Sequence, residues 1–263
     1  MISVTAEVKG VNKTSKNSFS ITDFDYSKEK PRAVLDTSLC DQDNQNHECV
    51  ISGSHFIAES ILFDNKVLIS AGTKITLGKG ADLIFESSVN MDGLKTNPIQ
   101  IQGNGTGGIF IYNQSSAISI LKHVNMSRLA TTSSALRKYS GAINGYGGSF
   151  NIDHLKIDGC ESEDQLNLVN TKIQIDGLFI SNAPSDAFDC DFCIGNAANL
   201  RFDYIGGDGL DVSGSNLRIT AIEAFEVNDK ALSVGERSNL IVSEATFDNV
   251  GTGVAVKDAS TVT

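Results

Sequence analysis

The chain has 263 residues, 40% of them hydrophobic, and a formal net charge of −11, so it can bury one sizeable core and shows no sign of disorder. Phosphate binding needs a basic face, and this charge therefore argues against a nucleic-acid partner. The sequence contains no apolar run of about 18 residues, and MISVTAEVKG lacks the basic start and apolar middle of a signal peptide. We therefore expect neither direct membrane insertion nor an export signal within the chain.

Residues 1–50 lack the repeat described below, and we expect them to form an N-terminal cap or the tail of a preceding domain. Cys40 and Cys49 flank the polar loop DQDNQNHE and are expected to lie close enough to form a disulfide. Such a bond would place the protein in an oxidising, extracellular or cell-surface compartment. At the other end, GVAVKDASTVT stops inside a strand-like alternation, so we expect flanking domains of the same native chain.

Residues 51–263 carry an internal repeat that predicts a parallel β-helix. The first half contains short strand-like segments broken by glycines, and the second half repeats with a step of 22 residues. The aligned segments are DQLNLV from Asp164, DAFDCD from Asp186, DGLDVS from Asp208, KALSVG from Lys230 and TGVAVK from Thr252. Apolar residues alternate within each segment, a second alternating segment follows each one, and no helical periodicity is sustained. A leucine-rich repeat has a similar period, but its Leu and Asn spacing is absent.

We therefore expect an all-β solenoid of about nine turns and about 22 residues per coil. Residues 130–141 (ATTSSALRKYSG) lengthen one interval and predict a loop that leaves the coil.

Residues 51–263 resemble the right-handed parallel β-helices of the pectate-lyase-like superfamily. The stretch LISAGTKITLGKGADLIFE followed by NPIQIQG is similar to the opening coils of β-helix regions in bacterial surface proteins. The segments SDAFDCDF, GDGLDVSGS and DKALSVGERS resemble repeats of bacterial surface or polysaccharide-associated proteins. The resemblance implies a right-handed coil and a surface location rather than a particular reaction.

Acidic residues are concentrated in residues 160–215, which hold ten Asp or Glu against two basic residues. The 22-residue alignment places them in two columns. The outward column is Asn144, Asn167, Asp189, Asp211, Ser233 and Ala255, and the corner column is Asp164, Asp186, Asp208, Lys230 and Thr252. Coils about 4.8 Å apart would bring like charges together at a cost of about 1 kcal/mol per pair in water. Small residues at 187, 209, 231 and 253 are expected to leave a shallow trough beside the acids.

Three features can offset this repulsion: a bound calcium ion, Lys230 at the end of the row, or raised carboxylate pKa values. The expected calcium ligands are Asp186, Asp189, Asp208 and Asp211. The alternative interpretation is that these acids accept hydrogen bonds from turn amides at the coil corners or are simply solvated.

Three functions are compatible with this pattern. The first is a secreted or surface-associated β-helix module that binds a carbohydrate polymer. The second is a polysaccharide lyase, epimerase or hydrolase acting on an acidic polysaccharide at the acid-rich outer wall. The third is a structural, adhesin-type scaffold. For an enzyme the expected catalytic residues are the acids Asp189, Asp208 and Asp211 and the base Lys230, and the expected substrate-binding residues are Asp186, Asn167, Asp191 and Arg237.

The remaining candidates are weaker. The chain has no Trp, and Tyr139, Tyr146 and Tyr204 can only partly replace it as stacking platforms for sugars. Cys190 and Cys193 have redox or zinc spacing but are expected to be small buried residues. The four histidines are scattered along the sequence and give no support to a metal triad.

Overall fold

The computed structural model describes residues 2–5, 18–21, 34–35, 39–40, 49–113, 117–130, 133–134 and 137–263. The chain divides into the units Met1–Pro31 and Arg32–Thr263. In the first unit, β1 (Ile2–Thr5) pairs antiparallel with β2 (Ser18–Ile21). Most of residues 1–50, for which a cap was predicted, lies outside the described residues. In the second unit, β3 (Val34–Leu35) and β4 (Cys49–Ile51) pair in parallel with strands of the coil that follows.

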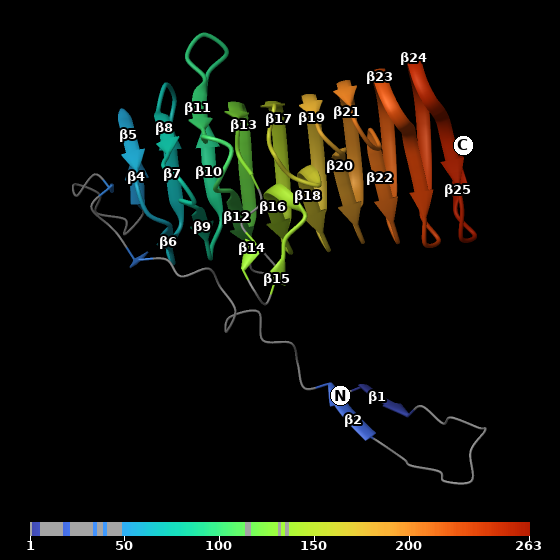
Figure 1. Cartoon of the computed structure of the whole chain (residues 1–263), viewed down its shortest axis with the longest axis horizontal. Helices are drawn as coiled ribbons and strands as arrows, with labels where there is room; N and C mark the ends of the chain where they lie inside the picture. The colour runs from blue at the N-terminus through green and yellow to red at the C-terminus, as the bar shows by residue number, and fades with distance from the viewer. Residues whose placement is uncertain are drawn as a thin grey trace. The chain divides into compact units, whose positions relative to one another are not determined.

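The second unit is a parallel β-solenoid in which three ladders of strands, called faces A, B and C, follow one another around each coil (Figure 1). Face A consists of β3, β6 (Ile61–Phe63), β9 (Leu83–Phe85), β12 (Ile109–Tyr112), β16 (Gly141–Tyr146), β18 (Asp164–Val169), β20 (Asp186–Asp191), β22 (Leu210–Ser213) and the ends of β23 (Asn216–Gly235) and β24 (Asn239–Val256).

Face B consists of β4, β7 (Val67–Ser70), β10 (Val89–Asp92), the first parts of β13 (Ile118–Ser127), β17 (Ser149–Asp158), β19 (Lys172–Ala183), β21 (Ile194–Ile205), β23 and β24, and finally β25 (Thr261–Val262). Face C consists of β5 (Ser54–Ile57), β8 (Lys74–Leu77), β11 (Ile99–Gln102) and the following parts of β13, β17, β19, β21, β23 and β24.

Residues that pair between successive coils of face A are 22 positions apart in the sequence, as predicted. On face A the register pairs join Leu166, Phe188, Leu210, Leu232 and Val254 in that order. The first four side chains are at most 1% exposed, whereas Val254 on the last coil is 42% exposed. The apolar stack and the count of about nine turns are confirmed. The described residues are all-β, which also confirms the predicted fold class. They include no helix long and apolar enough to cross a membrane.

The coils turn at corners where small or polar residues, or residues with a left-handed backbone conformation, occur. Between faces A and B, Phe192 and Gly214 adopt φ values of 55° and 60° on successive coils. Beside them, the backbone N–H groups of Cys193, Ser215 and Ser238 donate to a serine hydroxyl of the next coil at 2.8, 2.9 and 3.0 Å. These bonds satisfy amides that no strand partner reaches, so the corner repeats in register.

The long interval at residues 130–141 contains a small hairpin. It pairs β14 (Ser133–Ser134) with β15 (Arg137–Lys138). Tyr139 follows the hairpin and packs edge-on against Phe110, with ring centroids 4.7 Å apart. Phe110 faces outward on face A, yet it is fully buried with Ile84 beside it. This segment therefore leaves the coil, as predicted, and Tyr139 covers apolar side chains that would otherwise face water.

The cysteines form two disulfides. Cys40 and Cys49 are bonded, with Cα atoms 4.9 Å apart, which confirms the predicted pairing. Cys190 and Cys193 are fully buried, as predicted, and they are also bonded to each other. Cys160 is a free, buried cysteine, and burial raises the pKa of its thiol to about 12.

Candidate functional site

The acid-rich segments form one surface on the outside of face A, here called the acidic wall. Its central column consists of Asn167, Asp189, Asp211 and Ser233, which pair in register from β18 through β20 and β22 to β23 (Figure 1). The register is the one that the 22-residue alignment predicted. Because Phe188 and its equivalents turn into the core, the side chains of this column turn away from it.

The corner column precedes the central column along each coil and has a structural role. The carboxylate of Asp186 accepts a hydrogen bond from the backbone N–H of Asp208 at 2.8 Å, and that of Asp208 accepts one from Lys230 N–H at 3.0 Å. Earlier in the chain, Asp82 does the same for the N–H of Gly108. These acids are thus corner residues that bind amides of the next coil, as the alternative interpretation proposed.

Lys230 neutralises part of the acidic wall. Its ammonium group lies 3.1 and 3.3 Å from the two carboxylate oxygens of Asp208 and 2.5 Å from Asp229. The hydrogen bond to Asp229 is the main cause that raises the pKa of Lys230. A lysine must lose its proton to act as a base, so these contacts weigh against the predicted role of Lys230 as a catalytic base.

Burial and mutual repulsion keep protons on the acidic wall. Burial, followed by the charges of neighbouring carboxylates, raises the pKa of Asp189 to about 8. Burial also raises the pKa of Asp164 to about 6. The pKa values of Asp186, Asp191 and Asp211 are raised as well, in each case first by burial. Raised pKa values and Lys230 are two of the three features that the sequence suggested could offset repulsion.

The central column also holds two oxygen atoms, Oδ1 of Asn167 and Oδ1 of Asp211, that are buried and have no hydrogen-bond partner among the described residues. The hydroxyl of Ser233 hydrogen-bonds to Asp211 and opposes the rise in the pKa of that carboxyl. Asn167 is 6% exposed and Ser233 is fully buried, while the amide nitrogen of Asn167 donates to Ser140 and to Asp164. An unpaired buried acceptor costs about 1–3 kcal/mol, so a hydroxyl donor placed here would stabilise the protein.

Aromatic side chains adjoin the wall on the preceding coils and at the corner between faces A and B. Tyr112 and Tyr146 stack on the preceding coils of face A, with ring centroids 5.3 Å apart, and they share a register column with Asp191. The hydroxyls of Tyr112 and Tyr139 lie 3.1 Å apart. Next to Asp191 in the chain, Phe192 is 56% exposed and lines a groove of about 570 Å³ at the corner between faces A and B.

Three of the four predicted calcium ligands lie together. Asp186, Asp208 and Asp211 each offer a carboxylate oxygen, and these atoms lie within 4.8 Å of one another. The fourth, Asp189, is not part of this group, although it neighbours Asp211 in the central column. Carboxylate oxygens are the ligands that calcium prefers, but Lys230 already pairs with one of these acids.

The other predicted site residues lie near the wall. Asp191 is half-buried on the same strand as Asp189, and Arg237 is exposed at the corner after β23, with a φ of 64°. The predicted trough is wrong, because Ala187 and Ala231 are fully buried. The N–H groups of Ala187 and Phe188 both bond to carbonyls of the next coil, so two consecutive residues turn inward at this corner.

Sequence reasoning missed two groups of residues. Tyr112 lies in the segment IFIYNQ and was not considered as an aromatic partner, although its register with Tyr146 is visible once the long interval is removed. The expectation of scattered histidines is wrong for His123 and His154, whose ring centroids are 4.8 Å apart. The hairpin insertion separates these two histidines by more than one 22-residue step and hides their alignment.

No protein-family model matches the sequence, and comparisons with curated proteins and with solved structures give no significant match.

Proposed function

We propose that the acidic wall and the tyrosines beside it form a binding surface for a carbohydrate polymer. The observation that carries this proposal is the pair of buried acceptor atoms, Oδ1 of Asn167 and Oδ1 of Asp211, that have no hydrogen-bond partner among the described residues. Sugar hydroxyls are donors that can pair with such atoms, and the stacked rings of Tyr112 and Tyr146 offer the apolar contact that a sugar face needs. A polymer lying along the solenoid axis would meet an equivalent position about every 4.8 Å.

The charge of the wall favours a particular class of polymer. Carboxylates and amide oxygens accept hydrogen bonds, and the chain carries a net charge of −11. A neutral or amino-sugar polymer supplies donors or positive charge, whereas an acidic polymer would be repelled unless a cation bridges it to the wall. Calcium at Asp186, Asp208 and Asp211 would be such a bridge, and its participation is part of the proposal.

A glycoside hydrolase is the second candidate, and the protonation of Asp189 favours it. With a pKa of about 8, Asp189 keeps its proton at neutral pH and can serve as a general acid. Asp211 pairs with it in register on the next coil and would be the carboxylate partner. A lyase is less favoured, because Lys230, its expected base, is bound to two carboxylates.

The proposal also includes the superfamily to which the chain belongs and the compartment in which the protein is found. The coil length and the parallel ladders support membership of the pectate-lyase-like superfamily. The two disulfides support an extracellular or cell-surface protein, where such bonds persist.

A binding assay over three polymers tests the proposal. Chitosan, xylan and polygalacturonate represent amino-sugar, neutral and acidic chains, and each is titrated with calcium and with EDTA. We expect saturable binding to chitosan or xylan, and a loss of about tenfold or more in the Asp189→Asn, Asp211→Asn double variant. The control variant Glu244→Gln, Asp248→Asn removes two exposed acids, one at the corner between faces B and C and one on face C, and should bind as the parent does.

Three results of this assay decide between the candidates. Reducing ends released from a bound polymer by the parent, and not by Asp189→Asn, would favour the hydrolase. Absence of binding to every polymer would contradict the proposal, and the structural, adhesin-type scaffold would then be the remaining candidate. Equal binding by the parent and the double variant would place the binding surface elsewhere.

A further inference from the structure

The corner between faces B and C brings two histidines and an aspartate together, away from the acidic wall. His123 on β13 and His154 on β17 occupy the same corner position on successive coils, and Asp153 directly precedes His154. Each residue offers one nitrogen or carboxylate oxygen, and these three atoms lie within 4.8 Å of one another. We propose that they form a binding site for a divalent transition-metal ion such as zinc.

The donor set is chemically suited to this class of ion. Imidazole nitrogen and carboxylate oxygen bind Zn²⁺ at about 2.0–2.2 Å, so two ligands of one ion lie about 3–3.5 Å apart. The Nδ1 atom of His154 is 2.5 Å from Oδ1 of Asp153, and the two imidazole centroids are 4.8 Å apart. Small side-chain rotations would bring all three donors to coordination distance. The side chains of His154 and Asp153 are 59% and 42% exposed, so they are free to make these rotations.

The backbone holds the two histidines in place. Both adopt left-handed conformations, with φ values of 45° for His123 and 58° for His154. The next two coils place Gly177 and Asn199 at this corner, also with positive φ. Histidine and asparagine tolerate this conformation better than most residues. The corner therefore fixes the Cα positions, and coil stacking holds the two imidazoles side by side.

The surrounding charges favour a cation. Lys122 occupies the register position beside Asp153, but its ammonium group turns to Asp92 on the preceding coil, 3.6 Å away. On the following coil Asp176 adds a carboxylate, which accepts a hydrogen bond from Asn199 at 2.8 Å. No lysine ammonium is thus bonded to Asp153 among the ion pairs of the described residues.

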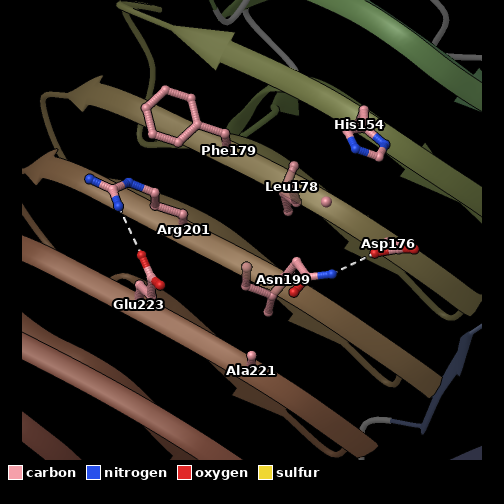
Figure 2. Close-up of a pocket in the computed structure, with 10 residues that line it drawn as sticks. His154, Asp176, Leu178, Phe179, Asn199, Arg201, Ala221 and Glu223 are labelled. Carbon is pink, nitrogen blue, oxygen red and sulfur yellow. Dashed lines mark hydrogen bonds and ion pairs between the residues drawn. The ribbon is translucent and has the colours of Figure 1, made fainter. Parts of the chain in front are cut away.

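The ion would keep one open coordination position at the edge of a groove. His154 is one of the residues that line a groove of about 450 Å³. Figure 2 shows Asp176 and Asn199 below His154, and Phe179 and Arg201 further along. Gly177 follows His154 in the corner column and has no side chain to cover the imidazole. With three protein ligands, a tetrahedral ion retains one position for water or for a ligand entering from this groove.

Zinc titration of the whole chain tests the site. We expect one Zn²⁺ per chain by isothermal titration calorimetry, and a Zn²⁺-dependent rise in melting temperature. His123→Ala and His154→Ala should each weaken the affinity about tenfold or more, and Asp153→Asn should weaken it less. His55→Ala removes a histidine on β5 that contacts the carbonyl of Ser52, and it should bind zinc as the parent does. Calcium, which prefers oxygen ligands, should not compete at equal concentration.

Two results would overturn the proposal. One is a parent protein that shows no saturable zinc binding below millimolar concentration. The other is zinc binding that persists unchanged in both His123→Ala and His154→Ala, since the ion would then lie elsewhere. Circular dichroism of each variant excludes unfolding as the cause of a loss. His154 is exposed and His123 and Asp153 are partly exposed, so we expect the variants to fold.

Discussion

Replacing Asp189 by Asn should stabilise the protein at alkaline pH and leave it unchanged near pH 4. In the folded chain Asp189 keeps its proton up to about pH 8, whereas its ordinary pKa is 3.8. The folded state therefore binds more protons than the unfolded state between these values. The free energy of unfolding must then fall as the pH rises through this window. Asparagine is neutral at every pH, and the variant should lose this part of the pH dependence.

The magnitude follows from the two pKa values. Complete ionisation of a carboxyl whose pKa rises from 3.8 to about 8 costs up to about 6 kcal/mol of stability. Asp189 is half-buried and shares its protons with neighbouring acids, so we expect about a third of this value, about 2 kcal/mol at pH 8.5. Asp164, with its pKa raised to about 6, acts in the same direction and preserves part of the pH dependence in the variant.

Urea unfolding at pH 4.5, 6.5 and 8.5 measures this effect for the parent, for Asp189→Asn and for Asp248→Asn. The last variant removes an exposed acid and should follow the parent at each pH. The reasoning is refuted if Asp189→Asn is destabilised at pH 8.5, or if its stability falls with pH as steeply as that of the parent.

Three further predictions concern the coil itself. Leu210→Ala should cost about 3 kcal/mol in urea unfolding, because this fully buried side chain fills the apolar stack of face A; a cost below about 1 kcal/mol would contradict the stacking. Gly195→Ala should be strongly destabilising, because an added Cβ would lie 1.9 Å from a backbone oxygen, whereas Gly80→Ala meets nothing within 4 Å and should cost about 1 kcal/mol. Equal melting temperatures for these two alanine variants would argue against the close contact between coils. Non-reducing peptide mapping should recover the Cys40–Cys49 and Cys190–Cys193 linkages; free thiols in aerobically purified protein would contradict them.

The sequence predicts the solenoid because its period is regular. Register depends on which residues alternate, and one slip would expose a whole set of apolar side chains. The alignment of Leu166, Phe188 and Leu210 therefore determines the coil without knowledge of any distance. The same alignment also placed Asp189 opposite Asp211.

The sequence repeat does not predict which way a side chain points at a corner, or which residues an insertion contacts. Ala187 turns inward because two consecutive amides bond to the next coil, which alternation alone cannot predict. Tyr139 reaches Phe110 from a segment outside the repeat, and the same segment hides the alignment of His123 with His154. The sequence suggested that carboxylate pKa values could be raised, but which acids are affected depends on burial and on the arrangement of several coils, so the assignment to Asp189 and Asp164 needs the structure.

A crystal structure of the protein soaked with a chitosan or xylan oligosaccharide would test the central claim most directly. The proposal predicts sugar density along the outer surface of face A, with hydroxyl or amino groups within hydrogen-bond distance of Oδ1 of Asn167 and Oδ1 of Asp211. Sugar bound on another face, or an acidic wall covered only by water at saturating oligosaccharide, would contradict it.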